Sequence, residues 1–207
     1  MKKILTFLGV ACLVAFAGCK RTNMLEVVQH AADVSVDTAG YVARVITLPE
    51  DLMAFETACP AYITYHQTDA RSQARIVVKA PAEMLEQTHV SIRGNGRLAV
   101  SLASGYRVPD NQTAVVDIYA PHISTFSLRG GGKCLRLGRV TADSLLRVSI
   151  DGVGVIVSEA LKASRIEADL RGVGSMALQG IEAHDMKASL KGTGSISLGG
   201  RLSGRQA

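Results

Sequence analysis

Three observations predict that this chain is an all-β protein, folded as a stacked β-solenoid with coils of about 20 residues. A sequence motif that consists of an aliphatic residue, any second residue and Gly-x-Gly begins at Leu128, Ile150, Leu170 and Leu190. Its successive intervals are 22, 20 and 20 residues, and a fixed period of this length is typical of repeat architectures. Apolar and polar residues alternate between the copies. The chain also has 20 Gly, no Trp and 4% aromatic residues, which suits a thin core of small aliphatic side chains.

The start of the chain has the features of a bacterial lipoprotein signal peptide over residues 1–18. A short basic segment precedes an apolar run over residues 4–16, which is too short to cross a membrane comfortably as a helix. The run ends in Phe16-Ala17-Gly18-Cys19, which resembles a lipobox, although Phe16 stands where Leu is usual. We expect cleavage before Cys19 and lipidation of Cys19 with fatty acids such as palmitate. Ordinary secretion with an incidental cysteine is the alternative.

A lipidated Cys19 would tether the mature chain to a membrane, because two or more acyl chains anchor a protein stably. Lys20 follows it in place of the Asp that retains some lipoproteins at the inner membrane, so we expect the outer membrane. The side of that membrane stays open. We divide the mature chain into a tether with N-terminal strands over 19–48, including a hairpin around 37–40, and a β-solenoid domain over 49–207.

The first half of this domain reads as short strands separated by turns. Alternating side chains predict a strand at 63–66, and Pro81 with acidic residues after it predicts a short helix. The segment Gly94-Asn95-Gly96 divides a strand pair. In chain order, the expected elements are a helical turn at 49–51, strands at 63–66 and 74–79, a helix at 81–86, the strand pair at 89–102, a loop at 105–112 and a strand at 115–119.

The order of these segments resembles the head GIN domain family of auto-transporter adhesins, which is common in Bacteroidetes. The resemblance covers residues 50–199 and rests on Ile63-Thr64-Tyr65-His66-Gln67, on Val115-Val116-Asp117-Ile118-Tyr119-Ala120-Pro121-His122-Ile123 and on the Gly-x-Gly repeats. It implies a right-handed parallel β-helix, or β-solenoid, and an adhesion-like role. No segment suited to an outer-membrane barrel follows residue 200, so we do not expect the chain to transport itself.

Within each repeat, side chains of one parity are apolar and those of the other are polar, as in strands with one buried face. In the third copy, this alternation places Ala168, Leu170, Met176 and Leu178 inside. Glycine at the interior parity lets the chain turn a corner or lets two backbones approach closely. Counting an earlier copy of the motif, we expect structural turns at Gly94, Gly96, Gly130, Gly132, Gly152, Gly154, Gly172, Gly174, Gly192 and Gly194.

Stacking at this period also predicts columns of charged side chains on the surface. Asp151 would lie between Arg129 and Arg171, which relieves repulsion in a column that ends at Lys191. The stack would end after Leu198 in an open edge, which is a ready surface for further strand pairing. An end-to-end homodimer is therefore one expected partner mode.

No catalytic residue, metal site or cofactor is predicted. The five histidines lack the spacing of metal ligands, and the Gly-x-Gly motifs lead into strands rather than into helix starts that would hold phosphate. We interpret Glu167, Asp169, Glu182 and Asp185 as solvated turn residues, with a carboxylate-lined groove as the alternative. Cys59 and Cys134 permit one disulfide, and a buried thiol at Cys134 is favoured.

The function predicted is a non-enzymatic cell-envelope lipoprotein, an adhesion module or a binding and scaffold module. The alternative is a carbohydrate-active enzyme, a lyase or hydrolase, on a β-solenoid. The expected partners are the membrane through the lipid anchor and a glycan or protein ligand. Nucleic acid is not expected, because the formal charge is only +5 and the basic residues lack interleaved aromatic side chains.

Overall fold

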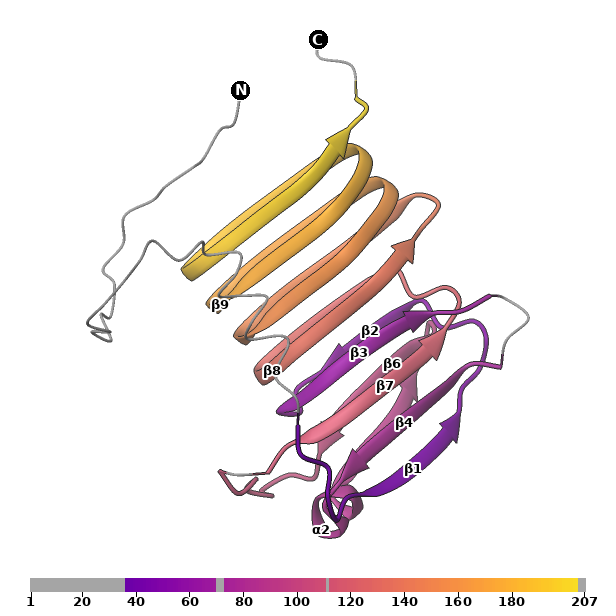
Figure 1. The fold of residues 1–207 in the computed structure, drawn as a ribbon, viewed down its shortest axis with the longest axis vertical. Helices are drawn as coiled ribbons and strands as arrows, with labels where there is room; N and C mark the ends of the chain where they lie inside the picture. Colours follow the sequence, from indigo (N-terminus) through magenta and orange to yellow (C-terminus); the bar gives the residue numbers. More distant parts are fainter. Residues whose placement is uncertain (1–35, 70–72, 111, 205–207) are drawn as a thin grey trace.

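Strands dominate the computed structural model, which describes residues 36–69, 73–110 and 112–204, so the predicted all-β class is confirmed (Figure 1). The signal peptide, Cys19 and the first part of the tether lie outside the described residues. Among those described, no helix is long and apolar enough to span a membrane. The elements are β1 (Val42–Thr47), β2 (Ala54–Thr57), β3 (Ala61–Gln67), β4 (Arg75–Ala80), α2 (Ala82–Glu86), β5 (Thr88–Arg93), β6 (Arg97–Leu102), β7 (Ala114–Ala120), β8 (Thr125–Thr141) and β9 (Leu145–Leu202).

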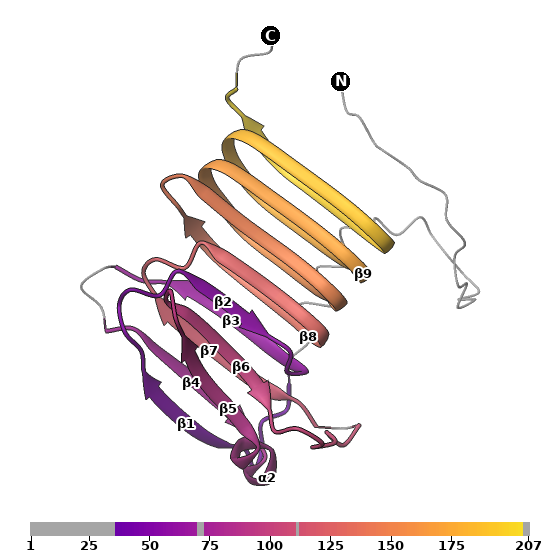
Figure 2. The ribbon, with the colours of Figure 1, turned by 180° about the vertical axis from the view of Figure 1, so that it is seen from behind.

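The strands form one curled sheet in the order β1-β4-β7-β3-β8-β2-β6-β5, and β9 pairs with β8. Strand β8 makes the sheet curl, because it contacts two different strands along its length. Its residues 125–128 pair in parallel with β2, and residues 134–137 pair in parallel with β3. The sheet therefore folds into two layers around a shared core, with β1, β4, β7 and β3 on one side and β5, β6 and β2 on the other (Figures 1 and 2).

The first half of the predicted 49–207 domain is not built from 20-residue coils. Its pairs β2–β6 and β3–β7 are parallel, but β4–β7 and β5–β6 are antiparallel, as is the pair of β4 with the preceding strand β1. An uninterrupted parallel solenoid over 49–207 is therefore not confirmed. The Gly94-Asn95-Gly96 segment is the turn of the β5–β6 hairpin rather than a corner of a stack. Asn95 and Gly96 have φ values of 66° and 62°, a left-handed conformation that these two residue types tolerate best.

Most of the elements expected in this half are present. The short helix forms directly after Pro81 as α2, which buries Met84 and Leu85 and contacts β1, β4 and β5. The prediction of a helical turn at 49–51 is wrong, because these residues form a simple turn that leads into β2. Strand β1 lies before the proposed boundary at residue 49, yet it pairs with β4 beyond that boundary.

The second half of the chain consists of four segments that lie on one another, which we call repeats 1 to 4 (125–145, 146–165, 166–185 and 186–204; Figure 1). Repeat 1 pairs in parallel with repeat 2, with Leu128 opposite Ile150 and Arg129 opposite Asp151. Backbone hydrogen bonds at the far corner continue the stacking. The Arg165 N–H donates to the carbonyl of Ser144 at 2.8 Å, and the Ser203 N–H donates to the carbonyl of Ala183 at 2.8 Å.

The predicted interior residues of repeat 3 are buried, with exposed fractions of 1% at Ala168 and 0% at Leu170, Met176 and Leu178. The core continues without a break from these residues into the two-layered half of the molecule. At the junction, the rings of Tyr65 and Phe126 pack with their centroids 4.9 Å apart. The Tyr65 hydroxyl donates a hydrogen bond of 2.7 Å to the Ala120 carbonyl, which satisfies a polar group inside the core.

The glycine motifs permit close stacking of successive backbones. A Cβ atom at Gly152, Gly172 or Gly192 would collide with the backbone of the corresponding glycine one repeat earlier. Gly172 and Gly192 also have φ values of 118° and 134°, which side-chain-bearing residues rarely adopt. Gly154, Gly174 and Gly194 form a second column of the same kind, which starts at Gly132.

Cys134 is buried as predicted, with 3% of its surface exposed, but it lies outside the main core. It belongs to a small cluster with Val157 and Ala177, on the opposite face of β8 from Leu135 and Leu137. The cause is a register shift between Gly131 and Cys134, which adds one residue and reverses the alternation. Cys59 and Cys134 both remain thiols, and burial raises the pKa of the Cys59 thiol to about 12.

Candidate binding groove

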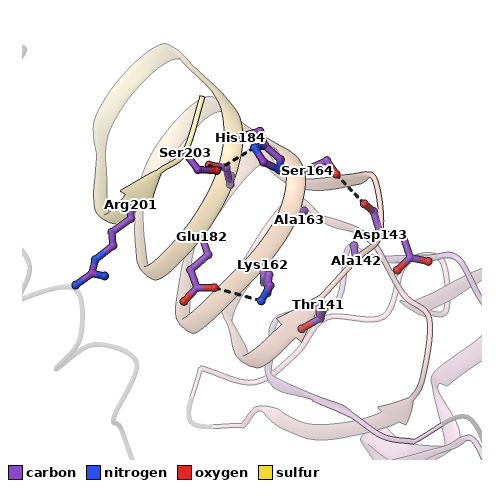
Figure 3. A pocket seen from close by; sticks show the side chains of 11 residues that line it. Thr141, Ala142, Asp143, Lys162, Ala163, Ser164, Glu182, His184, Arg201 and Ser203 are labelled. Carbon is purple, nitrogen blue, oxygen red and sulfur yellow. Dashed lines mark hydrogen bonds and ion pairs between the residues drawn. The ribbon is translucent and has the colours of Figure 1, made fainter. Parts of the chain in front are cut away.

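A groove runs along the corner of the stack where the second strand of each repeat ends. It has a volume of about 510 Å³, and Figure 3 shows its side chains. Small residues, Ala142, Ala163 and Ala183, occupy equivalent positions in repeats 1 to 3 and leave room between the two walls. The remaining lining residues are Thr141, Asp143, Lys162, Ser164, Glu182, His184, Arg201 and Ser203.

A second hollow, of about 780 Å³, continues this groove toward the two-layered half and shares Thr141, Ala142 and Asp143 with it. Gln67 braces the point where the two hollows meet. Its amide donates to the carbonyls of Pro121 at 2.9 Å and Thr141 at 2.8 Å, and it accepts a bond of 2.7 Å from the Thr141 N–H. The corner therefore offers one long polar path, to which His122 and Arg139 also contribute.

The walls of the groove are held by contacts between neighbouring repeats (Figure 3). On one wall, Lys162 forms an ion pair of 3.4 Å with Glu182. On the other, the Ser164 hydroxyl donates to the Asp143 carbonyl at 2.9 Å, and Ser203 Oγ lies 2.9 Å from His184 Nδ1. Because each contact joins residues about one repeat apart, the stacking of the backbone positions both walls.

The sequence matches a family model described as "Putative auto-transporter adhesin, head GIN domain" over residues 63–205. The chain belongs to this family. The resemblance noted from the sequence is thereby confirmed. No curated protein matches the sequence of this GIN domain.

Several solved structures are similar to this GIN domain. A putative adhesin from Bacteroides fragilis is 17% identical, with a TM-score of 0.49 over 76% of this chain and 96% of that one. A putative cell adhesion protein from Clostridium sporogenes is 11% identical, with a TM-score of 0.48 over 78% and 100% of the two chains. A putative lipid binding protein from Parabacteroides distasonis is 12% identical, with a TM-score of 0.46 over 81% and 97%.

The Ser203–His184 contact in the GIN domain has the first two members of a hydrolytic triad. A triad also needs a carboxylate that orients the imidazole. The adjacent Asp185 is engaged elsewhere, because its Oδ2 lies 3.1 Å from Arg165 Nη1. The pair is therefore better suited to hydrogen bonding with a ligand than to nucleophilic attack.

The carboxylates considered from the sequence lie on two different surfaces. Glu182 faces the groove, whereas Glu167 and Asp169 line a shallow hollow of about 320 Å³ on the charged strand face of the stack. Glu167 accepts hydrogen bonds from Arg147 at 2.6 Å and from Arg165 at 3.1 Å. The hydrogen bond from Arg147 lowers the pKa of Glu167, so this carboxyl is ionised at neutral pH and cannot serve as a general acid.

The register of the predicted charged column is confirmed where Arg129 lies opposite Asp151, but these two side chains form no ion pair among the described residues. Arg129 instead lies 3.9 Å from Glu56. Glu56 has 9% of its side chain exposed and also accepts hydrogen bonds of 3.0 Å from Arg93 and Arg97. Three arginines from separate strands thus neutralise one nearly buried carboxylate.

The residues named from the sequence as turns do not line the groove, because the glycine columns of β8 and β9 lie at the other corner of each repeat. Of the histidines, His184 and His122 contribute to the groove. His66 lies 3.4 Å from Asp117 and stacks on Tyr119. Among the described residues, no three His, Cys, Asp or Glu side chains are grouped so as to hold a metal ion.

Replacement of Arg147 by glutamine is expected to raise the pKa of Glu167 toward its ordinary value. Since the folded-state pKa of Glu167 is lowered, its contribution to stability is present above the unfolded-state pKa. That contribution disappears as the pH falls through the folded-state value. The variant should therefore be less stable than the parent at pH 7, and the difference should vanish in acid. NMR titration of the Glu167 carboxyl and denaturant melts over this pH range would measure both effects.

Arg171→Gln is the matched control for this prediction. Arg171 lines the same hollow but forms no ion pair within the described part of the chain. The Arg171→Gln variant should leave the pKa of Glu167 unchanged. An unchanged Glu167 titration in Arg147→Gln would show that the Arg147 contact is not maintained in solution.

Proposed function

We propose that this GIN domain is a non-enzymatic binding module of the cell envelope, and that its corner groove takes up an extended polar ligand. The observation that carries the proposal is the continuity of the groove, from Gln67 at the two-layered half to Ser203 in the last repeat. Its side chains offer donors and acceptors on two walls, and contacts between repeats hold them in place. A preformed polar groove of this kind binds without a large cost in ordering its own side chains.

A protein segment suits this groove better than a glycan. None of the described residues that line its two hollows is Phe, Tyr or Trp, and sugar rings are commonly bound on aromatic platforms. The charges along the path have both signs, with Asp143 and Glu182 beside Lys162 and Arg201. Such a path complements the alternating donors, acceptors and charges of an extended polypeptide.

We also propose that the module is anchored in the outer membrane by lipid on Cys19. The support is the apolar run over 4–16 followed by Ala17-Gly18-Cys19, together with the adhesin family to which the chain belongs. Cys19→Ala should move the protein from the membrane fraction to the soluble fraction of the cell. A Cys19→Ala protein that stays with the membranes would contradict the anchor.

For the second half of the chain, we propose a right-handed parallel β-solenoid with coils of about 20 residues. The support is the parallel pairing of repeat 1 with repeat 2 and the contacts of each glycine column with the repeat before it. Side-chain contacts such as Arg147–Glu167 and Ser195–Ser175 join residues 20 positions apart. Equivalent residues in successive coils would then be separated by about 4.8 Å.

The groove proposal is tested by filling the groove. Ser164 is exposed within it, so Ser164→Trp should block a ligand without disturbing the core. Ser104→Trp, at an exposed loop position outside the groove, is the matched control. The full chain would be screened on peptide arrays and glycan arrays, and we expect peptide binding that Ser164→Trp weakens at least tenfold. Binding that both tryptophan variants leave unchanged would exclude the groove, and glycan binding lost only in Ser164→Trp would change the ligand class.

The carbohydrate-active enzyme remains the second candidate, and Asp143 and Glu182 in the groove are the residues that favour it. Glycoside hydrolysis requires one carboxyl group that is protonated when the reaction begins. Glu182 is instead engaged in an ion pair of 3.4 Å with Lys162. New reducing ends released from envelope or plant polysaccharides, and lost in Glu182→Gln, would establish the enzymatic function.

A further inference from the structure

The two ends of the molecule differ in how their apolar residues are covered. At the first end, α2 covers the core and has Met84 buried completely. At the other end, Leu190 and Leu198 of repeat 4 are 43% and 42% exposed, whereas the equivalent Leu170 and Leu178 of repeat 3 are both 0% exposed. Repeat 4 thus has the interior side chains of a stacked layer without a layer above it in the described chain (Figure 1).

The backbone at this end is suited to pairing with a further strand. Residues 186–202 are extended as part of β9, and repeat 3 lies on one side of them. On the other side, no described residue continues the stack. An extended segment could therefore add to this edge by main-chain hydrogen bonds, with its alternate side chains over Leu190 and Leu198.

The charge of repeat 4 indicates which side chains such a segment should contain. Repeat 4 has Lys187, Lys191 and Arg201 and no Asp or Glu between residues 186 and 204. Within the described chain, none of these three cations forms an ion pair. The edge is therefore apolar at its centre, basic at its borders and without a counter-charge.

The molecule itself shows what layer is complementary to a basic repeat. Repeat 2 and the acidic repeat 3 are joined by Arg147 to Glu167 at 2.6 Å, by Lys162 to Glu182 at 3.4 Å and by Arg165 to Asp185 at 3.1 Å. Lys187 follows Glu167 by the same 20 positions, but Glu167 is engaged by Arg147 and Arg165, so Lys187 has no ion-pair partner within the described chain. A layer above repeat 4 would be matched in the same way if it were acidic.

A second copy of this chain does not supply such a layer. Its own repeat 4 would bring like charges together in a symmetric end-to-end dimer, which is destabilising. The edge strands at its other end, β1 and β5, contain Arg44 and Arg93 and no carboxylate. The exposed Glu83 and Glu86 of that end belong to the helix α2, which offers no strand edge. The end-to-end homodimer expected from the sequence is thus disfavoured by charge.

We propose that the open face of repeat 4 is a docking edge for an extended acidic segment of a partner protein. The segment pairs with the two sides of repeat 4 before and after its glycine corner, places aliphatic side chains over Leu190 and Leu198, and places carboxylates beside Lys187 and Lys191. This edge adjoins the corner groove at Arg201, which also lines the groove, but its occupation does not require the groove to be filled.

The proposal can be tested with a copy of residues 166–185 of this chain in which Arg171, which would lie opposite Lys191 in the repeat register, is replaced by glutamate. We expect the labelled peptide to bind the full chain, as measured by fluorescence anisotropy. Binding should weaken at least tenfold when the five side-chain carboxylates of the peptide are replaced by amides. It should weaken by a similar factor in the double variant Lys187→Glu, Lys191→Glu, whose two positions are exposed. Arg107→Glu makes a charge reversal at an exposed loop position between β6 and β7, and it should leave binding unchanged.

Three results would overturn the proposal. The first is equal binding of the amide peptide, and the second is equal binding to the Lys187, Lys191 variant. The third is a dimer of the chain alone, seen by sedimentation velocity and abolished by Leu190→Arg, because the occupant would then be a second copy. Ser164→Trp should not alter peptide binding at this edge, so failure here and failure of the groove proposal are distinguishable.

Discussion

Replacement of Gly172 by alanine is expected to lower the free energy of unfolding by about 4 kcal/mol. Two effects contribute, and each typically costs about 1–3 kcal/mol. The first is strain, because the φ of Gly172 is 118°, a region that alanine rarely adopts. The second is overpacking, because the new Cβ would collide with the carbonyl oxygen of Gly152. Urea-induced unfolding followed by far-ultraviolet circular dichroism would measure the change.

Gly131→Ala is the matched control for this prediction. Gly131 belongs to the same family of motifs, but its φ is not positive and a Cβ there would have no atom within 4 Å. Its substitution should change stability by less than about 0.5 kcal/mol, as is usual for surface changes. Equal stability of the two variants would mean that repeats 2 and 3 do not stack through their glycines, and it would argue against the proposed coil architecture.

Replacement of Phe126 by alanine is expected to cost about 3–5 kcal/mol, the usual range for truncation of a buried phenylalanine. Phe126 is 0% exposed, packs on Tyr65 and lies between Phe55 and Val148 in the parallel ladder. It is thus in contact with both the two-layered half and the repeats. The cavity should loosen the junction, which hydrogen exchange of the β8 amides would detect alongside denaturant melts.

Tyr65→Phe tests the same junction without creating a large cavity. It removes only the hydroxyl that donates to Ala120, so the expected cost is about 1 kcal/mol. A Phe126→Ala variant no less stable than Tyr65→Phe would show that the junction is not a tightly packed part of the core.

Local chemistry explains why several elements could be predicted from the sequence. Pro81 presets the backbone for the start of α2, and the Asn95-Gly96 pair suits a hairpin turn. The inward positions of repeat 3 follow from the alternation of its side chains, because strand geometry alone places Ala168 and Leu170 on one face. These predictions depend on neighbours in the chain, and the fold preserves them.

Features that depend on how strands meet in space were missed. The first half contains antiparallel pairs because β4 returns between β1 and β7, and no short motif specifies that order. Cys134 changes face because one extra residue enters the ladder after Gly131. The cluster around Glu56 contains arginines from three separate strands, and no spacing in the sequence predicts it.

The groove could be predicted from the sequence only in part. Its wall contact between Lys162 and Glu182 joins opposite charges at the repeat period, as does the contact of Arg147 with Glu167 on the strand face. Both pairs are visible in the sequence when charges 20 positions apart are compared along the whole repeat. The predicted column through Asp151 used the same period but considered only the glycine motif itself.

The order of charges in repeats 2 to 4 also limits how the chain could lengthen. The acidic repeat 3 lies between the more basic repeat 2 and repeat 4, so duplication of repeat 3 alone would place carboxylates against carboxylates. Duplication of an acidic and a basic repeat together would preserve every ion pair and would extend the groove by about 9.6 Å, two strand spacings. The natural unit of growth for this molecule is therefore a pair of repeats, and a ligand-binding path of this kind should vary in length by even steps.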